Sequence, residues 1–143
     1  GSSITLNGIE ISHTKALLGH SDADVAMHAI TDAIFGALSA GDIGQWFPPS
    51  EQKWKNASSE IFLRKALLLC KERGFIINHL DCTIICETPK IGPHAEKMRE
   101  NISEITKIDI DKVSVKATTT EQLGFTGRNE GIAAQATATL IKK

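Results

Sequence analysis

Apolar and polar residues alternate over two short runs near the start of the chain. The first run covers residues 4–6 and the second residues 9–11, and Asn7-Gly8 stands between them. A period of two residues is typical of a strand that buries one face, and an Asn-Gly pair between two such runs favours a tight turn. We therefore predict a β-hairpin over residues 4–11.

The next apolar pattern repeats every three to four residues, which is typical of an amphipathic helix. Ser21 and Asp24 form the S-x-x-D pattern of a capping box, which places the start of this helix near Asp22. Gly41 is the expected C-cap residue. The expected apolar stripe consists of Met27, Ile30, Ala33, Ile34, Ala37 and Leu38.

The remaining sequence alternates between these two periods. We expect helices over residues 59–73 and 93–106, and strands over residues 75–87, 113–117 and 131–141. The connections are expected to be a long surface loop over 41–57 with its two tryptophans as aromatic anchors, turns over 88–93 and 109–112, and a polar loop over 118–130. Because helices pass between the strands of one small sheet, we predict a single α+β domain over residues 1–143, with a mixed β-sheet and its helices on one face.

Composition and charge narrow the class of protein. The 143 residues are 41% hydrophobic and 23% charged, which is typical of one globular domain. The net charge is −1 and no basic stripe is present, so we expect neither nucleic-acid nor membrane binding. No signal peptide is recognisable and no apolar run approaches about 18 residues, so we expect a soluble, cytoplasmic protein.

The three cysteines are Cys70, Cys82 and Cys86. They are too few for a disulfide framework and fit a reducing cytoplasm. Cys82 and Cys86 are about 13 Å apart if they lie in one strand, at about 3.3 Å per residue. At that separation they would share neither a metal ion nor a disulfide.

Three ionisable side chains fall on one face of the first expected helix. Asp24, His28 and Asp32 are spaced i, i+4 and i+8. An imidazole in such a row can bind a metal ion, and it can equally be a buried histidine hydrogen-bonded to a carboxylate. His20 precedes the helix, where it either helps to hold an anion beside the backbone N–H groups or lies free on the surface.

Other candidates lie in the expected loops. Asp42, between two glycines, either contacts a sugar hydroxyl or forms a turn. Residues 118–121 follow a strand with three hydroxyls and a carboxylate, which suit phosphate and a hard divalent cation, or form a solvated turn. Lys90 either contacts phosphate or is exposed. Arg128 and Glu130 fit a structural salt bridge.

Five motifs occur in order along almost the whole chain: H-S-D-A-D-V-A-M-H-A-I-T-D-A, G-D-I-G-x-x-F-P, P-K-I-G-P-H, K-A-T-T-T-E-Q-L-G-F-T-G-R and E-G-I-A-A-Q-A. With these motifs the chain closely resembles the 2-C-methyl-D-erythritol 2,4-cyclodiphosphate synthases of non-mevalonate isoprenoid biosynthesis. The resemblance implies a lyase that converts 4-diphosphocytidyl-2-C-methyl-D-erythritol 2-phosphate into the cyclic diphosphate and releases CMP. It also implies zinc and a second cation, magnesium or manganese, which neutralise phosphate charge.

The resemblance assigns roles to individual residues. His28 matches the zinc-binding histidine, and Glu121 matches the carboxylate that binds magnesium or manganese. His20 and Thr119 match the pair that polarises phosphate, and are the expected catalytic residues. Residues 86–92 correspond to the cytidine pocket. All expected substrate contacts are Ser21, Asp42, Ile43, Gly44, Phe47, Cys86, Pro89, Lys90, Ile91, Gly92, Ala117, Thr118, Thr120, Phe125 and Arg128.

The resemblance further implies a homotrimer whose active sites lie between neighbouring subunits. His28 of one subunit would then act together with Glu121 of another. Arg128 and Glu130 would lie near a central threefold cavity, where members of the family are reported to hold isoprenoid diphosphates.

The zinc site departs from the family pattern. The family holds zinc with an Asp-x-His pair near the N-terminus as well as the helix histidine. No Asp-x-His occurs before residues 4–11, and His13 follows them. Either that segment lies upstream of Gly1 or the chain lacks it, and we expect the former because the other motifs are intact. His28 alone would bind zinc weakly.

Two other functions stay open at this point. One is a binding module of the same fold that holds a cytidine nucleotide or an isoprenoid diphosphate without turnover. The other is a metal-dependent phosphohydrolase, in which water attacks and the products are linear methylerythritol phosphates.

Overall fold

The computed structural model describes residues 2–13, 24–54 and 57–143. Strands β1 (Ser2–Leu6) and β2 (Ile9–His13) pair antiparallel and form a two-stranded sheet of their own. Asn7 and Gly8 connect them with φ values of 51° and 80°. Two consecutive positive φ values belong to the turn that matches the twist of paired strands, which is why Asn-Gly is favoured here. The predicted hairpin is confirmed.

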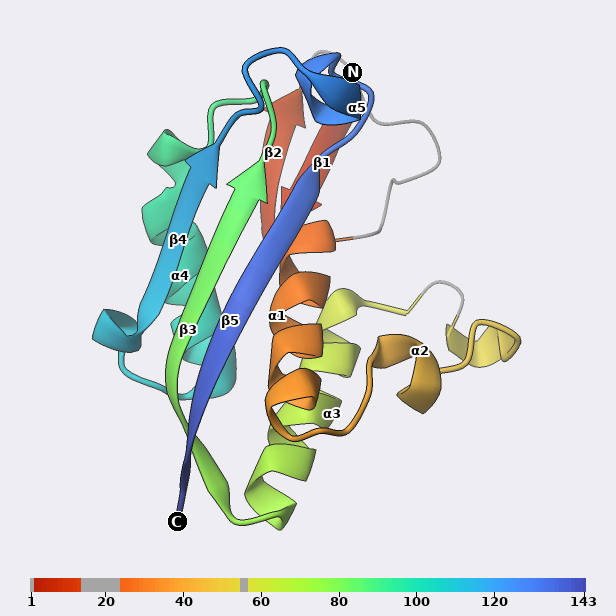
Figure 1. Ribbon diagram of the computed structural model, residues 1–143, viewed down its shortest axis with the longest axis vertical. Coiled ribbons are helices and arrows are strands. Elements are labelled where there is room, and N and C mark those ends of the chain that lie inside the picture. The colour runs from red at the N-terminus through yellow and green to blue at the C-terminus, as the bar shows by residue number, and fades with distance from the viewer. Residues whose placement is uncertain (1, 14–23, 55–56) are drawn as a thin grey trace.

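A second sheet has three strands in the order β4-β3-β5 (Figure 1). β3 (Phe75–Ile85) lies in the middle, parallel to β4 (Val113–Thr118) and antiparallel to β5 (Ala133–Lys142). Alternate residues of β3 are buried on one face, as their pattern predicted. The mixed sheet is therefore confirmed, although the hairpin is not part of it.

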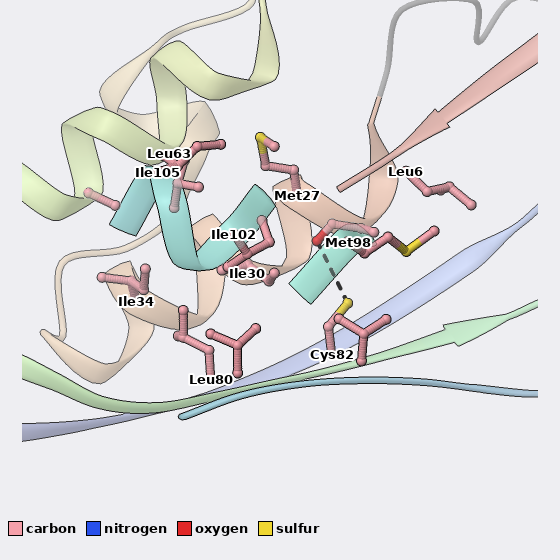
Figure 2. Close-up of a cluster of buried hydrophobic side chains, with 14 of the residues drawn as sticks. Leu6, Met27, Ile30, Ile34, Leu63, Leu80, Cys82, Met98, Ile102 and Ile105 are labelled. Carbon is pink, nitrogen blue, oxygen red and sulfur yellow. Dashed lines mark hydrogen bonds between the residues drawn. The ribbon is translucent and has the colours of Figure 1, made fainter. Parts of the chain in front are cut away.

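Helices α1 (Val25–Ala37), α3 (Ser59–Glu72) and α4 (Ala95–Thr106) lie on one face of this sheet, behind it in Figure 1. α1 packs against β3 and β5, α3 packs against α1 and β3, and α4 packs against β4. The predicted α+β arrangement is confirmed. Figure 2 shows the core between these layers, where the labelled side chains are Leu6, Met27, Ile30, Ile34, Leu63, Leu80, Cys82, Met98, Ile102 and Ile105.

None of the described helices is long and apolar enough to cross a membrane. The cysteines are all free and buried, and Cys82 lies within β3.

α1 begins later than the sequence predicts. Its N-cap residue is Asp24, whose carboxylate accepts the backbone N–H of Met27 at 2.9 Å. The expected start near Asp22 is therefore wrong, because a carboxylate that satisfies the first free N–H groups fixes where a helix starts. Ser21, the other member of the predicted capping box, lies outside the described residues.

α1 also ends earlier than expected, at Ala37 and not near Gly41. Leu38 is the C-cap residue, and Ser39 takes a φ of 54°. A left-handed residue directly after a helix terminates it, so Gly41 is not needed for this purpose. Ala37, which was expected in the apolar stripe, is exposed. Phe35, which was not part of the expected stripe, is fully buried in the core.

The expected long loop over residues 41–57 contains two short helices, α2 (Ile43–Trp46) and the 3-10 turn η1 (Gln52–Trp54). The Trp46 indole donates to the carbonyl of Ala40 at 2.8 Å. Its ring stacks on Phe35, with centroids 5.7 Å apart. The expected aromatic anchor is therefore confirmed by Trp46, whereas the two short helices were not predicted.

Three more one-turn elements were not predicted: η2 (Gly92–His94), η3 (Ile110–Lys112) and α5 (Gly124–Gly127). η2 contains Pro93 and leads directly into α4, which consequently begins at Ala95.

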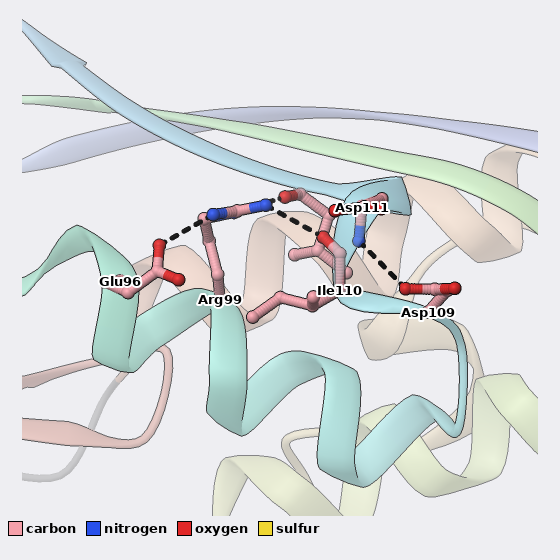
Figure 3. A network of polar contacts seen from close by, with 6 residues as sticks. Glu96, Arg99, Asp109, Ile110 and Asp111 are labelled. Atoms are coloured by element: carbon pink, nitrogen blue, oxygen red, sulfur yellow. Dashed lines mark hydrogen bonds and ion pairs between the residues drawn. The ribbon is translucent and has the colours of Figure 1, made fainter.

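Arg99 joins α4 to the start of β4 (Figure 3). Its Nε donates to the carbonyl of Val113 at 2.7 Å, and its Nη2 donates to the carbonyl of Ile110 at 3.0 Å. Its Nη1 pairs with Glu96 at 2.6 Å. A planar guanidinium holds several acceptors in fixed geometry, so this residue sets the position of the strand whose other end carries the candidate site.

Candidate functional site

Strands β3 and β4 end side by side at the upper edge of the sheet in Figure 1. Their parallel pairing runs to Ile85 opposite Thr118, and the amide of Cys86 then donates to the carbonyl of Thr118 at 3.2 Å. The segments after both strands therefore meet, although α4 separates them in the sequence. The carboxyl ends of parallel strands are a common location for ligand sites.

A hollow of about 200 Å³ opens between these two segments. Its lining residues are Cys86, Glu87, Pro89, Lys90, Ile91, Gly92, Ala117, Thr118 and Thr119. All except Glu87 are residues that the sequence singled out. The structure thus brings together candidates from two separate motifs.

The turn after β4 has an unusual backbone. Glu121 and Gln122 have φ values of 55° and 67°, which few residues other than glycine adopt. The Glu87 carboxylate accepts the amide of Gln122 at 2.8 Å, and the hydroxyl oxygen of Thr119 accepts the amide of Glu121 at 3.2 Å. Because that oxygen acts as acceptor, the hydroxyl hydrogen of Thr119 can still donate to a ligand in the hollow. Strained backbone held by specific side chains is frequent at ligand sites.

Thr120 and α5 hold the other side of this turn. The Thr120 hydroxyl donates to the carbonyl of Leu123 and lies 3.0 Å from the hydroxyl of the buried Thr126. A Cβ at Gly127 would lie 2.3 Å from the carbonyl carbon of Gln122, so only glycine fits there. The predicted polar loop is instead a compact unit that supports the turn.

Three candidates on this unit, Glu121, Phe125 and Arg128, are exposed. Arg128 pairs with Glu130, with 3.0 Å between Nη2 and Oε1, so the expected salt bridge is confirmed. Within the described part of the chain, no hydrogen bond or ion pair engages the carboxylate of Glu121. This carboxylate can therefore bind a cation.

Two charged residues line the hollow, and of these Glu87 already accepts the amide of Gln122, whereas Lys90 offers a positive charge to a ligand. Lys90 is exposed and lines the hollow. Cys86 is buried, and its thiol donates to the carbonyl of Pro89 at 3.6 Å. Burial raises the pKa of this thiol, Glu87 raises it further and Lys90 opposes the change. The thiol is therefore a neutral contact at physiological pH and a poor nucleophile.

His28 lies in α1, one turn after Asp24, and is half-buried. Its Nε2 lies 2.9 Å from the hydroxyl oxygen of Ser59, the first residue of α3. The Phe62 ring meets it edge-on, with centroids 5.6 Å apart. Burial lowers the pKa of His28, whereas Asp24 and Asp32 oppose this change. Within the described residues, no other hydrogen bond reaches the imidazole, so none of them engages Nδ1.

The two aspartates of the predicted row accept hydrogen bonds from backbone amides. Asp24 is buried, and its carboxylate accepts the amides of Asn7 at 2.8 Å and Gly8 at 2.7 Å besides capping α1. Burial raises the pKa of Asp24, and these N–H groups oppose the increase. Asp32 is exposed and accepts the amide of Ile43 at 2.8 Å. The row is therefore one histidine between two carboxylates that position neighbouring segments.

The candidates of the G-D-I-G motif surround α2. Asp42 is the N-cap residue, and its carboxylate accepts the amide of Gln45 at 3.0 Å. Ile43 is half-buried and Gly44 is exposed. The turn-forming role that the sequence left open for Asp42 is thus present, and its exposed side chain can also meet a ligand.

Phe47 directly follows α2 and is buried. Its ring centroid lies 4.6 Å from that of Phe62 and 4.8 Å from that of Trp54. Since Phe62 also packs on His28, Phe47 connects the segment after α2 to the surroundings of the imidazole. In this chain its position is that of a packing residue.

The candidates form two separate groups in the described chain. One group surrounds the hollow after β3 and β4, and the other lies where α1, α2 and α3 meet. His20 and Ser21 fall outside the described residues. Across residues 2–13, 24–54 and 57–143, no three His, Cys, Asp or Glu side chains are placed to hold one metal ion.

Sequence reasoning missed Glu87 and Ser59. Glu87 stands inside the stretch assigned to the pocket, directly after an expected buried strand, and that position was the available signal. Ser59 gave no signal, because its contact with His28 joins residues 31 positions apart.

Comparisons with known proteins point to one family. The model of the YgbB family matches residues 1–141. The 2-C-methyl-D-erythritol 2,4-cyclodiphosphate synthase of Roseobacter denitrificans is 59% identical over 142 residues, which cover 99% of this chain and 89% of that protein. The bifunctional enzyme IspD/IspF of Dinoroseobacter shibae is 61% identical over 142 residues, which cover 99% of this chain and 36% of that enzyme. This chain thus spans little more than a third of the bifunctional relative.

A solved structure of IspF from Plasmodium falciparum in complex with CDP has a similar fold. It is 38% identical, with a TM-score of 0.86, and the match covers 99% of this chain and 85% of that chain.

Proposed function

This chain belongs to the YgbB family, that of the 2-C-methyl-D-erythritol 2,4-cyclodiphosphate synthases, and we propose that it catalyses the reaction of that name. The substrate would be 4-diphosphocytidyl-2-C-methyl-D-erythritol 2-phosphate. The products would be the cyclic diphosphate and CMP.

The observation that carries this proposal is the hollow at the ends of β3 and β4. Backbone groups of residues 86–92 can contact the edge of a pyrimidine base, and Lys90 adds a positive charge. Thr118 and Thr119 place hydroxyls beside it, where the phosphates of a nucleotide would follow the sugar. The CDP complex of the Plasmodium falciparum protein supports cytidine as the base.

The proposed reaction joins two phosphates of one molecule without water. An oxygen of the 2-phosphate forms a bond to the β-phosphorus, and the bond from that phosphorus to the bridging oxygen breaks. The electron pair leaves with CMP. Because both reacting groups are anionic, the protein must position them and stabilise their charge. We assign this role to the Thr119 hydroxyl, whose oxygen is already held by the amide of Glu121, and to His20.

His28 and Glu121 are the proposed metal ligands. Ser59 engages Nε2 of His28, which leaves Nδ1 for zinc. The open carboxylate of Glu121 suits magnesium or manganese. A bound divalent cation would neutralise phosphate charge and act as a Lewis acid. His28 supplies one ligand, so a complete zinc site needs further ligands besides the described residues.

We also propose that the active form is a homotrimer with shared sites. Within one chain the hollow is lined by the segments after β3 and β4, whereas His28 contacts α3. A second copy can supply the half that each group lacks. Arg128 and Glu130 would then lie near the threefold axis, beside a cavity for an isoprenoid diphosphate.

Phosphorus NMR of the full-length protein with substrate, zinc and magnesium tests the proposed reaction. We expect CMP and the cyclic diphosphate in equal amounts. Linear methylerythritol phosphates would show a phosphohydrolase instead. Nucleotide binding without any turnover would show a binding module, and either result would overturn the proposal.

Thr119→Ala tests the catalytic assignment within the hollow. Loss of one donor to the reacting phosphates should lower kcat on the order of a hundredfold while CDP affinity changes little. Steady-state kinetics and calorimetry measure the two quantities. Thr119→Ser keeps the hydroxyl and should retain most of the activity. An equal loss of kcat and affinity in Thr119→Ala would mean that the hydroxyl only binds.

A further inference from the structure

A groove lies at the end of the molecule opposite the candidate site. It is bounded by the C-terminal ends of α3 and α4, the start of β3 and the end of β5, at the lower end of Figure 1. Its volume is about 600 Å³, against about 200 Å³ for the hollow after β3 and β4. Cys70, Ile77 and Ile105 are buried beneath it, and Ile76 is 45% exposed in its wall. The groove therefore has an apolar floor.

The rim of this groove is positively charged. Lys71, Lys107, Lys112 and Lys143 line it, and Asp109 is the one acidic residue in its lining. The whole chain has 16 basic and 17 acidic residues, so this excess of positive charge is local. None of the four lysines forms an ion pair with another residue that the structure describes. Their charges are available to a ligand.

Part of this charge has a structural role. Lys71 lies in the last turn of α3 and Lys107 is the C-cap residue of α4, where positive charge offsets the helix dipole. Lys112 and Lys143 lie outside both helices, so the dipoles do not account for them. Asp109 already accepts the amide of Asp111 at 3.3 Å.

We propose that this groove binds a small amphipathic anion, an aliphatic chain that ends in a phosphate or a carboxylate. The chain would cover the apolar floor, and the head group would meet the lysines of the rim. An apolar pocket of this size with a few polar groups at its edge is typical of small-molecule sites. Lysine ammonium groups bind such head groups as point charges. No residue of the groove belongs to the candidate active site, so this inference stands independently of the proposed reaction.

Titration of the full-length protein with octyl phosphate, octanoate, octanol and inorganic phosphate tests the proposal. Carbon-detected methyl NMR should show shifts at Ile77 and Ile105 with both amphipathic anions. Octanol and inorganic phosphate should bind on the order of tenfold more weakly, because each lacks one half of the interaction. The stronger of octyl phosphate and octanoate identifies the preferred head group. Octanol binding as tightly as octyl phosphate, or no shift at these methyls, would overturn the proposal.

Lys112→Glu places a negative charge on the rim and should weaken octyl phosphate binding on the order of tenfold. Lys112 lies in η3 and is exposed, so this substitution does not alter the packing of the core. Lys97→Glu, at an exposed position of α4 that does not line the groove, makes the same charge change and should leave the affinity unaltered. Equal affinities of Lys112→Glu and the unmodified protein would rule out the lysine rim as the anion contact.

Discussion

At the scale of single residues, the two ring nitrogens of His28 have different surroundings. Nε2 lies 2.9 Å from the Ser59 hydroxyl, and Nδ1 is open within the described structure. A histidine that binds a metal ion usually donates its other N–H to a fixed acceptor, which sets the tautomer and the ring orientation. Ser59 is therefore expected to act as a positioning residue for His28, the proposed zinc ligand.

Ser59→Ala should lower the zinc affinity of the full-length protein by roughly 10- to 100-fold. Competition with a chelator measures this affinity. In the metal-free protein, nitrogen NMR should show His28 protonated on Nε2, and Ser59→Ala should weaken that preference.

The neighbouring Ser58 offers a matched control. Its hydroxyl caps α3 by accepting the amide of Glu60 at 3.3 Å, whereas the hydrogen bond to His28 comes from Ser59. Ser58→Ala should cost about 1 kcal/mol of stability and leave zinc affinity unchanged. Equal zinc affinities of Ser59→Ala and Ser58→Ala would contradict the positioning role.

At the scale of elements, one carboxylate connects the hairpin to α1. Asp24 accepts N–H groups from Asn7, Gly8 and Met27, all within 2.9 Å. Asn101 of α4 holds the same turn by donating to the carbonyl of Asn7 at 2.8 Å. The two-stranded sheet is thus fixed to the helix layer by the backbone of its turn. Because α1 carries His28, this joint also positions the imidazole.

Asp24→Asn should destabilise the protein by about 1–3 kcal/mol. The amide has one acceptor oxygen, so its NH₂ group must face an N–H group that the carboxylate accepted. Urea unfolding measures the change. Asp42→Asn is the control, because Asp42 caps α2 from an exposed position and asparagine caps equally well. Equal losses in the two variants would show that the contacts to the hairpin contribute nothing beyond capping.

At the scale of the whole molecule, a thiol lies at the centre of the contact between helices and sheet (Figure 2). Cys82 is fully buried in β3, and burial is the main cause that raises the pKa of its thiol to about 11. In the unfolded chain this thiol is exposed to water and loses its proton at lower pH. From about pH 9 to pH 11 the unfolded state therefore binds fewer protons, and the free energy of unfolding should fall as the pH rises.

Cys82→Ala removes this titration. Between about pH 8 and pH 11, stability of the unmodified protein should fall by on the order of 2 kcal/mol more than that of Cys82→Ala. Urea unfolding of both proteins across this range gives the comparison. The chain has no tyrosine, and its lysines are common to both proteins, so their titration cancels. If the free energies of unfolding of the two proteins changed with pH in parallel, the Cys82 thiol would not be the cause of the loss of stability.

The sequence pattern predicted the elements whose cause is local. Asn7-Gly8 gave the hairpin because both residues accept positive φ, and the alternation from Leu80 to Ile84 gave a strand with one buried face. The resemblance to the family brought out almost every residue that lines the hollow. Contacts between residues that are distant in the sequence were predicted neither from the pattern nor from the resemblance.

Three misses share this physical cause. Asp24 starts α1 because it also meets a turn 17 residues earlier in the chain. Helix α2 was not predicted within the loop over 41–57, and it ends at Trp46, whose ring stacks on Phe35 of α1. Glu87 belongs to the site through its bond to the amide of Gln122, 35 residues away. Each depends on tertiary packing, which residue spacing does not encode.

The parallel pairing of β3 and β4 has a thermodynamic consequence. The connection between the two strands contains α4, and both of its ends line the hollow. A ligand that contacts both residues 86–92 and residues 117–119 acts as a reversible cross-link between the two ends of this connection. The affinity for the ligand and the free energy of local unfolding of the β3-α4-β4 unit are then thermodynamically linked. At a ligand concentration of 100 times Kd, the unit gains roughly 2.7 kcal/mol against unfolding.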